Sequence, residues 1–235
     1  MSTLSLLYKQ EYAINEKIKI YIPTVGEILD FGEDEYYSII SSLTSMPMDV
    51  MVQLDDVNID YTQITEYELF ILMFEGIRNQ DTHLVFGDLD LSKLKFDEKT
   101  MSFYDPVNDV RVDRRMQQQI AATLRKLHHL EKNRKKPANE EAKEYLLKRA
   151  REKMKRHKGR SNDSQLESLI IALVNTEQFK YDFAGARDLT IYQFNESVRQ
   201  VAKKIEYDHK IDGVYHGTID PKGLSRDELN WLVHK

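Results

Sequence analysis

The period of the hydrophobic pattern changes along the chain, from alternation near the N-terminus to helical spacing farther on. Residues 3–22 read as extended, and the alternating apolar positions at their end are Ile14, Ile18, Ile20 and Ile22. This alternation predicts a strand pair that turns near Lys9–Glu11. A second alternation in residues 94–104 flanks a turn at 97–99, which predicts a small β-hairpin.

Most other apolar residues recur every three or four positions, the spacing that places them on one face of a helix. Several of these segments follow a residue whose side-chain oxygen can accept from the free N–H groups of a first helical turn: Thr24, Thr65, Asp113, Asn139, Thr190 and Ser225. Glu68 and Glu228 stand three residues after Thr65 and Ser225, the spacing of a capping box. Gly32 is expected to end or bend the first helix.

The segment from Thr65 to Ile77 has the broadest apolar face in the first half of the chain. We expect it to supply central core positions, namely Leu69, Phe70, Leu72, Met73 and Ile77. Two long helices are predicted after Asp113 and after Asn139, separated by residues 133–137. We expect them to pair as a long helical hairpin that projects from the body.

These elements predict an α+β fold that is mainly α. It would consist of an N-terminal strand pair with helices, the small β-hairpin, the long helical hairpin and C-terminal helices. The predicted division has an acidic α+β portion at 1–112 and a basic helical hairpin at 113–160. A C-terminal helical portion at 161–235 would pack on the first, and Trp231 is expected in its core.

The charge of the chain reverses between residues 124 and 160. This stretch holds fifteen Lys and Arg against five Glu, a net +10, whereas residues 1–123 carry −12 and residues 161–235 carry −3. A chain with an acidic part and a basic part is suited to docking on another surface, and a second copy of itself is one such surface.

The most basic helical stretch supplies one set of candidate partner contacts: Lys148, Arg149, Arg151, Lys155 and Arg156. Three interpretations are open, namely a phosphate-binding surface, a contact with an acidic protein and a solvated helix face. Glu residues are interspersed at helical spacing, and Tyr145 is the one aromatic residue, so stacking on single-stranded nucleic acid is poorly supported. The pattern therefore favours protein contact or solvation over nucleic acid.

A second set of candidate contacts is the aromatic group around Gly32, which comprises Phe31, Tyr36 and Tyr37. Aromatic residues in such a cluster usually belong to a core. Their polar tips also suit a protein interface, so both interpretations stay open.

Composition and motifs indicate no catalytic, cofactor or metal site. The fractions of 41% hydrophobic and 31% charged residues belong to a folded chain. There is no cysteine, and the sequence has no phosphate-binding glycine motif, no serine-hydrolase turn and no zinc-type spacing of its seven His. An enzyme would need a pocket with convergent acidic groups such as Asp88, Asp90 and Asp105. We therefore predict a protein without enzymatic activity.

The N-terminus lacks the basic start and long apolar run of a signal peptide, and no stretch approaches about 18 apolar residues. We expect no membrane partner. The absence of cysteine fits the reducing cytoplasm.

Two stretches resemble proteins encoded in the tail modules of phages and prophages of Gram-positive bacteria. IPTVGEILDFGEDEYYSIISSLTSMP, residues 22–47, resembles their N-terminal part. DLTIYQFNESVRQVAKKIEYDHKIDGVYHGTIDPKGLSRDELNWL, residues 188–232, resembles their C-terminal part. Together they cover less than half of the chain, and the shared pattern contains no motif with assigned functional residues.

The resemblance implies a role in tail morphogenesis, in the cytoplasm of the bacterial host or in the virion. One such role is an assembly chaperone for the tape-measure protein, and another is a structural tail or baseplate subunit. The expected partners are the tape-measure or other tail proteins and further copies of the chain. A nucleic-acid-binding protein that uses residues 124–160 is the alternative from another class.

Overall fold

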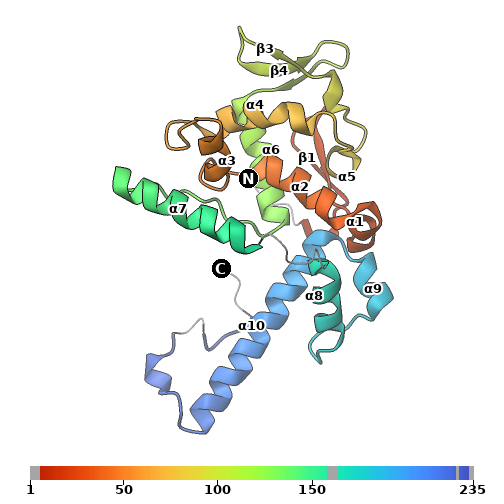
Figure 1. Cartoon of the computed structure of the whole chain (residues 1–235). Coiled ribbons are helices and arrows are strands. Elements are labelled where there is room, and N and C mark those ends of the chain that lie inside the picture. Colours follow the sequence, from red (N-terminus) through yellow and green to blue (C-terminus); the bar gives the residue numbers. More distant parts are fainter. Residues whose placement is uncertain (1–5, 158–163, 226–227, 233–235) are drawn as a thin grey trace. The chain divides into compact units, whose positions relative to one another are not determined.

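The computed structural model describes residues 6–157, 164–225 and 228–232. The chain forms two compact units (Figure 1). Unit 1 comprises residues 1–23 and 27–163, and unit 2 comprises residues 24–26 and 164–235. The predicted class is confirmed, since the fold is α+β and mainly helical. The predicted division into three parts stays a prediction. It was based largely on the distribution of charge along the chain, whereas the two units are defined by which residues pack together.

Unit 1 begins with a short 3₁₀ helix, η1 (Leu6–Tyr8), and an antiparallel strand pair, β1 (Glu11–Ala13) and β2 (Lys19–Tyr21). The strand pair is confirmed, but its predicted turn near Lys9–Glu11 is wrong. The turn lies between the strands, where the side-chain oxygen of Asn15 accepts hydrogen bonds from the backbone N–H groups of Lys17 and Ile18, at 2.8 and 2.7 Å. A carboxamide that bonds the backbone two residues on fixes a turn locally.

Helices α1 (Val25–Phe31) and α2 (Glu33–Thr44) are separated by Gly32, which has a φ of 114°. Residues that carry a Cβ rarely adopt this backbone conformation. Gly32 adopts it and ends the first helix, as predicted. Helix α3 (Met51–Asp56) follows after a loop through Pro47.

Helix α4 (Glu66–Ile77) starts with the predicted capping box, in which Thr65 and Glu68 bond each other's backbone. Its expected core positions Leu69, Phe70 and Ile77 are buried and Met73 is partly buried. The expectation for Leu72 is wrong, because its side chain is 52% exposed. Phe74 is buried instead, with its ring stacked on that of Phe103 at 3.8 Å between centroids. Because α4 carries apolar residues on several sides, their spacing in the sequence did not show which side is buried.

The predicted β-hairpin is confirmed as β3 (Lys95–Asp97) and β4 (Ser102–Asp105), preceded by α5 (His83–Phe86) and η2 (Leu91–Lys93). A third strand, β5 (Val110–Val112), extends it into an antiparallel sheet of order β3-β4-β5. The sequence did not predict β5. Val110 and Val112 are buried and Arg111 is exposed, but three residues are too few to show a clear alternation.

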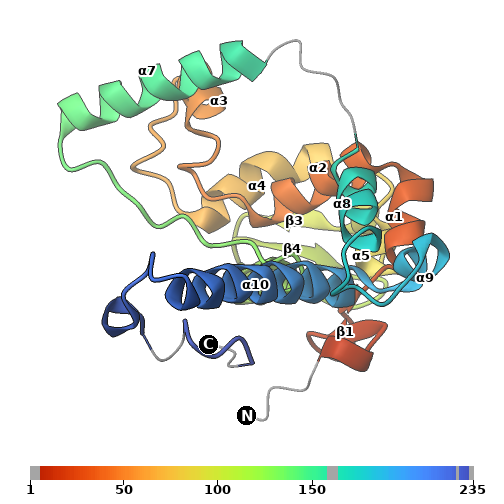
Figure 2. The same cartoon turned by 90° about the horizontal axis from the view of Figure 1, so that it is seen from below.

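The two long helices are confirmed as α6 (Arg114–Leu127), capped by Asp113, and α7 (Glu140–His157). They do not pair as the predicted hairpin. Helix α6 packs mainly on α2, α4 and β5, whereas α7 packs on α3 (Figures 1 and 2). The reason is that the apolar stripe of α6 is buried in the core, and the non-helical connection 128–139 is long enough to carry α7 to another surface.

Unit 2 contains α8 (Gln165–Val174), α9 (Phe183–Asp188), α10 (Ile191–Tyr215) and η3 (Pro221–Gly223). Helix α8 packs on α9 and α10 through Leu166, Ile170 and Leu173, which are buried. Helix α10 has the capping residue predicted for it, since Thr190 and Gln193 form a capping box. Residues 24–26 join this unit through a hydrogen bond from the Val25 N–H to the Leu189 carbonyl, at 2.9 Å.

The predicted capping box of Ser225 and Glu228 is present, with hydrogen bonds in both directions. The helix predicted to follow it is absent from the described residues 228–232, which form turns, while residues 226–227 and 233–235 lie outside the described part. Trp231 is partly buried rather than a full core residue, and its ring lies 5.6 Å from the Nζ atom of Lys204.

Candidate partner-binding surface on helix α7

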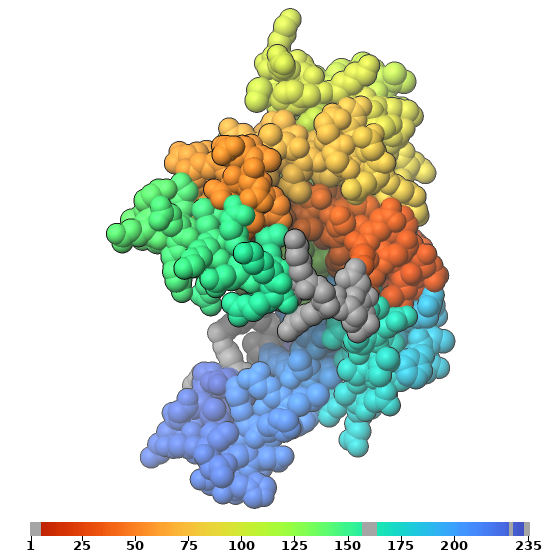
Figure 3. All heavy atoms as spheres, viewed as in Figure 1, coloured from red at the N-terminus to blue at the C-terminus, as the bar shows by residue number. Residues whose placement is uncertain are grey.

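One face of α7 is used inside unit 1. Lys143 Nζ lies 2.8 Å from Asp60 Oδ2. Arg151 pairs with two consecutive residues of α3: its Nη2 atom lies 2.6 Å from Asp55 Oδ2 and 2.6 Å from Asp56 Oδ1. Between these ion pairs, Leu147 packs against the buried cluster of Leu54, Tyr61 and Leu69. Positions 143, 147 and 151 are four residues apart and share one helix face, and Figure 3 shows α7 in green lying against α3 in orange.

The ion pair of Lys143 and Asp60 on this docking face keeps its charges over a wide pH range. The hydrogen bond from Lys143, together with those from the Thr62 backbone and hydroxyl, lowers the pKa of Asp60 to about 2. The hydrogen bonds that Arg151 donates to Asp55 and Asp56 raise the pKa of Arg151. The ion pair of Lys143 and Asp60 therefore persists well below neutral pH.

Four of the five predicted basic contacts on α7 are exposed: Lys148, Arg149, Lys155 and Arg156. With 3.6 residues per turn, Arg149 and Arg156 lie opposite the docking face, whereas Lys148 and Lys155 lie beside it. We call these four residues the outer basic face. Within the described ranges, Arg156 approaches Glu152 at 3.9 Å, and the other three have no ion-pair partner. Arg151, the fifth candidate, belongs to the docking face. The structure thus separates Arg151 from the other four basic residues, although the sequence pattern placed all five in one candidate contact surface.

Part of the charge pattern of α7 stabilises the helix itself. Glu140 and Glu141 lie in the first turn, while Lys155 and Arg156 lie in the last. Charges placed in this way interact favourably with the helix dipole, typically by about 0.3–1 kcal/mol each. Lys148 and Arg149 lie in the middle of the helix, where this effect is small. These two cations are therefore not explained by the helix dipole.

The aromatic candidates are not equivalent in the structure. Tyr36 is buried, and its hydroxyl oxygen lies 3.0 Å from Nε2 of His128. The Tyr37 ring packs edge-on against Tyr36 at 5.3 Å, and Phe31 packs edge-on against His83 at 5.4 Å. Tyr36 is thus a core residue, while Tyr37 and Phe31 remain partly accessible.

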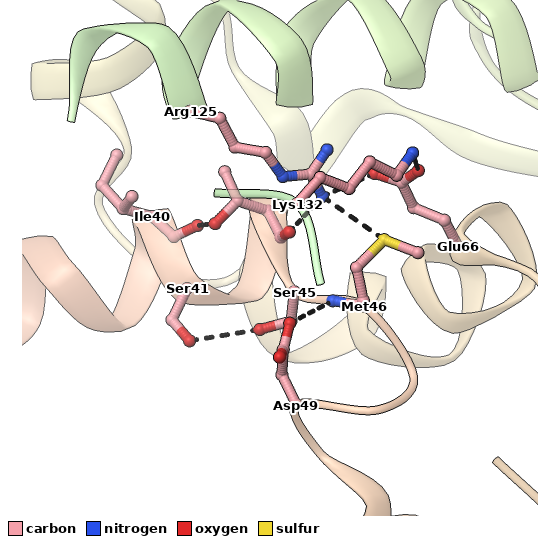
Figure 4. A network of polar contacts seen from close by, with 9 residues as sticks. Ile40, Ser41, Ser45, Met46, Asp49, Glu66, Arg125 and Lys132 are labelled. Atoms are coloured by element: carbon pink, nitrogen blue, oxygen red, sulfur yellow. Dashed lines mark hydrogen bonds and ion pairs between the residues drawn. The ribbon is translucent and has the colours of Figure 1, made fainter. Parts of the chain in front are cut away.

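A buried ionic network was missed at the sequence level (Figure 4). Arg125 Nη2 lies 2.6 Å from Glu66 Oε1, Lys132 Nζ binds the other carboxylate oxygen, and Arg125 also donates to the Thr44 carbonyl. Although burial alone raises the pKa of Glu66, the hydrogen bonds from Lys132 and Arg125 hold it below its ordinary value. In the sequence Glu66 resembles an ordinary first-turn carboxylate, so only the fold reveals this role.

Because Lys132 lies in the connection between α6 and α7, the network ties this connection to the start of α4. Asn133 adds a hydrogen bond from its amide nitrogen to Asp49 Oδ1, at 3.0 Å. The path of the chain into α7 is therefore fixed by polar contacts of residues far apart in sequence.

Of the three acidic groups considered for an enzyme, Asp90 and Asp105 act as turn formers, while Asp88 lies in the turn after α5. Asp90 accepts hydrogen bonds from the backbone and hydroxyl of Ser92, and Asp105 accepts from the Asn108 side chain at 2.6 Å. Across the described ranges, no three His, Asp or Glu side chains are grouped so that they could hold a metal ion. No helix in the same ranges is both long and apolar enough to cross a membrane.

Comparison with known protein families finds a similarity in the C-terminal part of the chain. Residues 155–234 match the family described as YomV second domain, a phage-associated domain family. The matched segment begins near the end of α7 and includes α8, α9 and α10. No curated protein and no solved structure matches the chain. The C-terminal third of this protein is therefore similar to a phage-associated domain.

Proposed function

We propose that this protein is a non-enzymatic phage tail morphogenesis factor that acts through protein–protein contacts. The role that we favour is a tail assembly chaperone for the tape-measure protein, and a structural tail or baseplate subunit is the alternative. The phage-associated match of residues 155–234 and the resemblance of residues 22–47 and 188–232 to tail-module proteins support a role in phage biology. The structural observation that carries the proposal is the outer basic face of α7.

The outer basic face suits contacts that form and dissociate. Exposed ion pairs contribute about 0–1 kcal/mol each and are screened by salt, while they steer an oppositely charged partner into place. A resident subunit would need a larger and more apolar interface. A polar surface on a helix held by its other face is therefore better suited to a transient assembly factor than to a permanent subunit.

The partner contact is tested by charge reversal. The variant Lys148→Glu, Arg149→Glu, Lys155→Glu, Arg156→Glu should lose co-purification with tape-measure or other tail proteins expressed from the same module. A matched control changes Lys17, Lys95, Lys99 and Lys222 to Glu, which are exposed cations elsewhere, with the same change in net charge. The control should retain the partner. Equal binding by both variants would remove the outer basic face from the proposal.

The two tail roles are separated by quantitative mass spectrometry of purified particles beside the unassembled soluble fraction. A chaperone should be absent from particles and enriched in soluble complexes with the tape-measure protein. A fixed stoichiometry to the tail tube in particles would instead identify a virion subunit. If no tail protein accompanies the chain in either fraction, tail morphogenesis is refuted.

Nucleic-acid binding is the second candidate function, and one observation favours it. Tyr145 is 62% exposed and lies one turn before Arg149, so an aromatic ring adjoins the outer basic face. Retention of DNA on a filter at about 50 mM salt, lost in the four-residue Glu variant and retained in the matched control, would support this function. No retention by the wild-type chain would exclude it.

A further inference from the structure

Unit 1 contains a groove that the outer basic face of α7 does not line, although it shares Tyr61 with the cluster on which Leu147 packs. It has a volume of about 280 Å³ and lies between the loop at residues 46–48, the segment 61–66 and the connection at 133–137. Small-molecule sites usually measure about 300–1,000 Å³. The groove is therefore of a size for one or two side chains rather than for a cofactor.

One side of the groove is apolar, and the other carries polar and charged side chains that include the buried Glu66. Met46, Pro47, Met48 and Ile64 line it. Methionine side chains adapt to the shape of a partner and are common on surfaces that bind peptides. Tyr61 also lines the groove; it is 4% exposed, and its hydroxyl has no hydrogen-bond partner within the described part of the chain.

One rim of the groove is strongly basic. Arg134, Lys135 and Lys136 are consecutive, exposed and without an ion-pair partner among the described residues. The nearby carboxylates do not neutralise them. Glu66 is bound by Arg125 and Lys132, and Asp49 accepts from Asn133 and from the Met46 backbone. Asp49 keeps its negative charge, because both of its donors are neutral, but the three cations outnumber it and the rim remains positive.

The rim is held in place by the buried network. Lys132 and Asn133 anchor the connection immediately before Arg134. The three cations thus stand on a segment whose start is fixed at the edge of the groove. A preorganised rim reduces the conformational entropy that a ligand would otherwise have to remove.

We propose that this groove binds a short peptide segment of another protein in which acidic side chains alternate with apolar ones. The apolar side chain enters between Met46 and Met48, and the acidic side chains pair with the cations at 134–136. This inference names a second contact, separate from the outer basic face of α7. It does not require the partner to be a tail protein.

The test uses the intact chain with ¹³C-methyl methionine and follows the methyl resonances by NMR during titration with a blocked hexapeptide of alternating Asp and Leu. We expect Met46 and Met48 to shift in a saturable manner, while Met101 and Met154, which are exposed elsewhere, stay unchanged. Two control peptides alternate Lys with Leu and Asp with Ser. Equal saturation with either control would overturn the proposal, because the groove would then not select both charge and apolar character.

Two variants separate this site from the outer basic face. Arg134→Glu, Lys135→Glu, Lys136→Glu should weaken binding of the Asp-Leu peptide at least tenfold, whereas Lys148→Glu, Arg149→Glu, Lys155→Glu should bind as wild type does. A thermal melt checks that both variants fold. If Met46 and Met48 shift with protein concentration in the absence of peptide, a second copy of the chain occupies the groove and the proposal is wrong. If neither methyl shifts at all, it is also wrong.

Discussion

The hydroxyl oxygen of Tyr36 lies 3.0 Å from Nε2 of His128, and both side chains are buried. Burial of the imidazole, with a smaller contribution from the nearby His129, lowers the pKa of His128 to about 4. The ring is therefore neutral at physiological pH, while Nδ1 has no partner within the described residues. Protonation would place an uncompensated charge between α2 and α6.

This relationship predicts acid sensitivity. The pKa of His128 is lower in the folded than in the unfolded chain, so the unfolded state binds more protons between about pH 6.5 and about pH 4. The contribution of His128 to the free energy of unfolding is therefore complete above about pH 6.5. It is lost as the pH drops toward 4, by about 3 kcal/mol at most. Urea unfolding of unit 1 at several pH values measures this slope.

His128→Gln is the matched variant, because glutamine can bond the Tyr36 hydroxyl and does not titrate. Its stability should vary less between pH 6.5 and 4 than that of the wild type. Carboxylates with lowered pKa values, such as Glu66 and Asp60, contribute to the free energy of unfolding above their unfolded pKa of about 4. They lose this contribution as the pH falls from there toward their folded pKa. An unchanged slope in the variant would show that His128 is not responsible.

The buried ion pair of Glu66 and Arg125 predicts a large effect of a single substitution. Glu66→Ala leaves the Arg125 guanidinium buried without its carboxylate, which should lower the free energy of unfolding by about 3–5 kcal/mol. The double variant Glu66→Leu, Arg125→Met should recover most of this loss, because the buried guanidinium is gone and water can solvate Lys132, whose side chain is 31% exposed. Denaturant unfolding measures both.

Glu75→Ala is the control for that experiment. Glu75 pairs with Arg78 at 2.9 Å but is largely exposed, so its loss should change stability by less than about 1 kcal/mol. A small effect of Glu66→Ala, similar to that of Glu75→Ala, would mean that water enters the network freely.

The docking of α7 predicts a local effect of Leu147→Asp. The carboxylate would face Asp55 and Asp56 and lose the apolar contact with Leu54 and Tyr61. Backbone amides of α7 should then exchange at least tenfold faster, which corresponds to about 1.4 kcal/mol. Hydrogen exchange with mass spectrometry reports this directly, and Lys148→Asp on the outer basic face is the control. Equal exchange in both variants would argue against docking through Leu147.

The two capping boxes predict separable effects on the two units. Thr65→Ala removes the hydroxyl that caps α4 in unit 1, and Thr190→Ala does the same for α10 in unit 2. Each should lower the stability of its own unit by about 1 kcal/mol. Amide exchange, monitored in both units, should show the loss in one unit at a time. Loss in both units from either change would indicate that they unfold together.

The sequence by itself determined the features that depend on neighbouring residues. Thr65 and Glu68 cap α4 because a side chain three residues away reaches the free backbone groups of a first turn. Gly32 breaks the helix because its own φ permits it, and the hairpin at β3 and β4 follows from alternation on both sides of a turn. The basic character of α7 was also evident, since it is a property of composition.

The tertiary structure alone decided which residues meet across the fold. Tyr36 and His128 are 92 residues apart, Glu66 and Arg125 are 59 apart, and Lys143 and Asp60 are 83 apart. Periodicity gives a helix its faces but does not say which partner covers each face. The same limit explains why Arg151 is paired on α3 while Lys148 is exposed, and why α6 and α7 pack separately. These choices depend on the free energy of packing summed over distant segments, which no local pattern of residues contains.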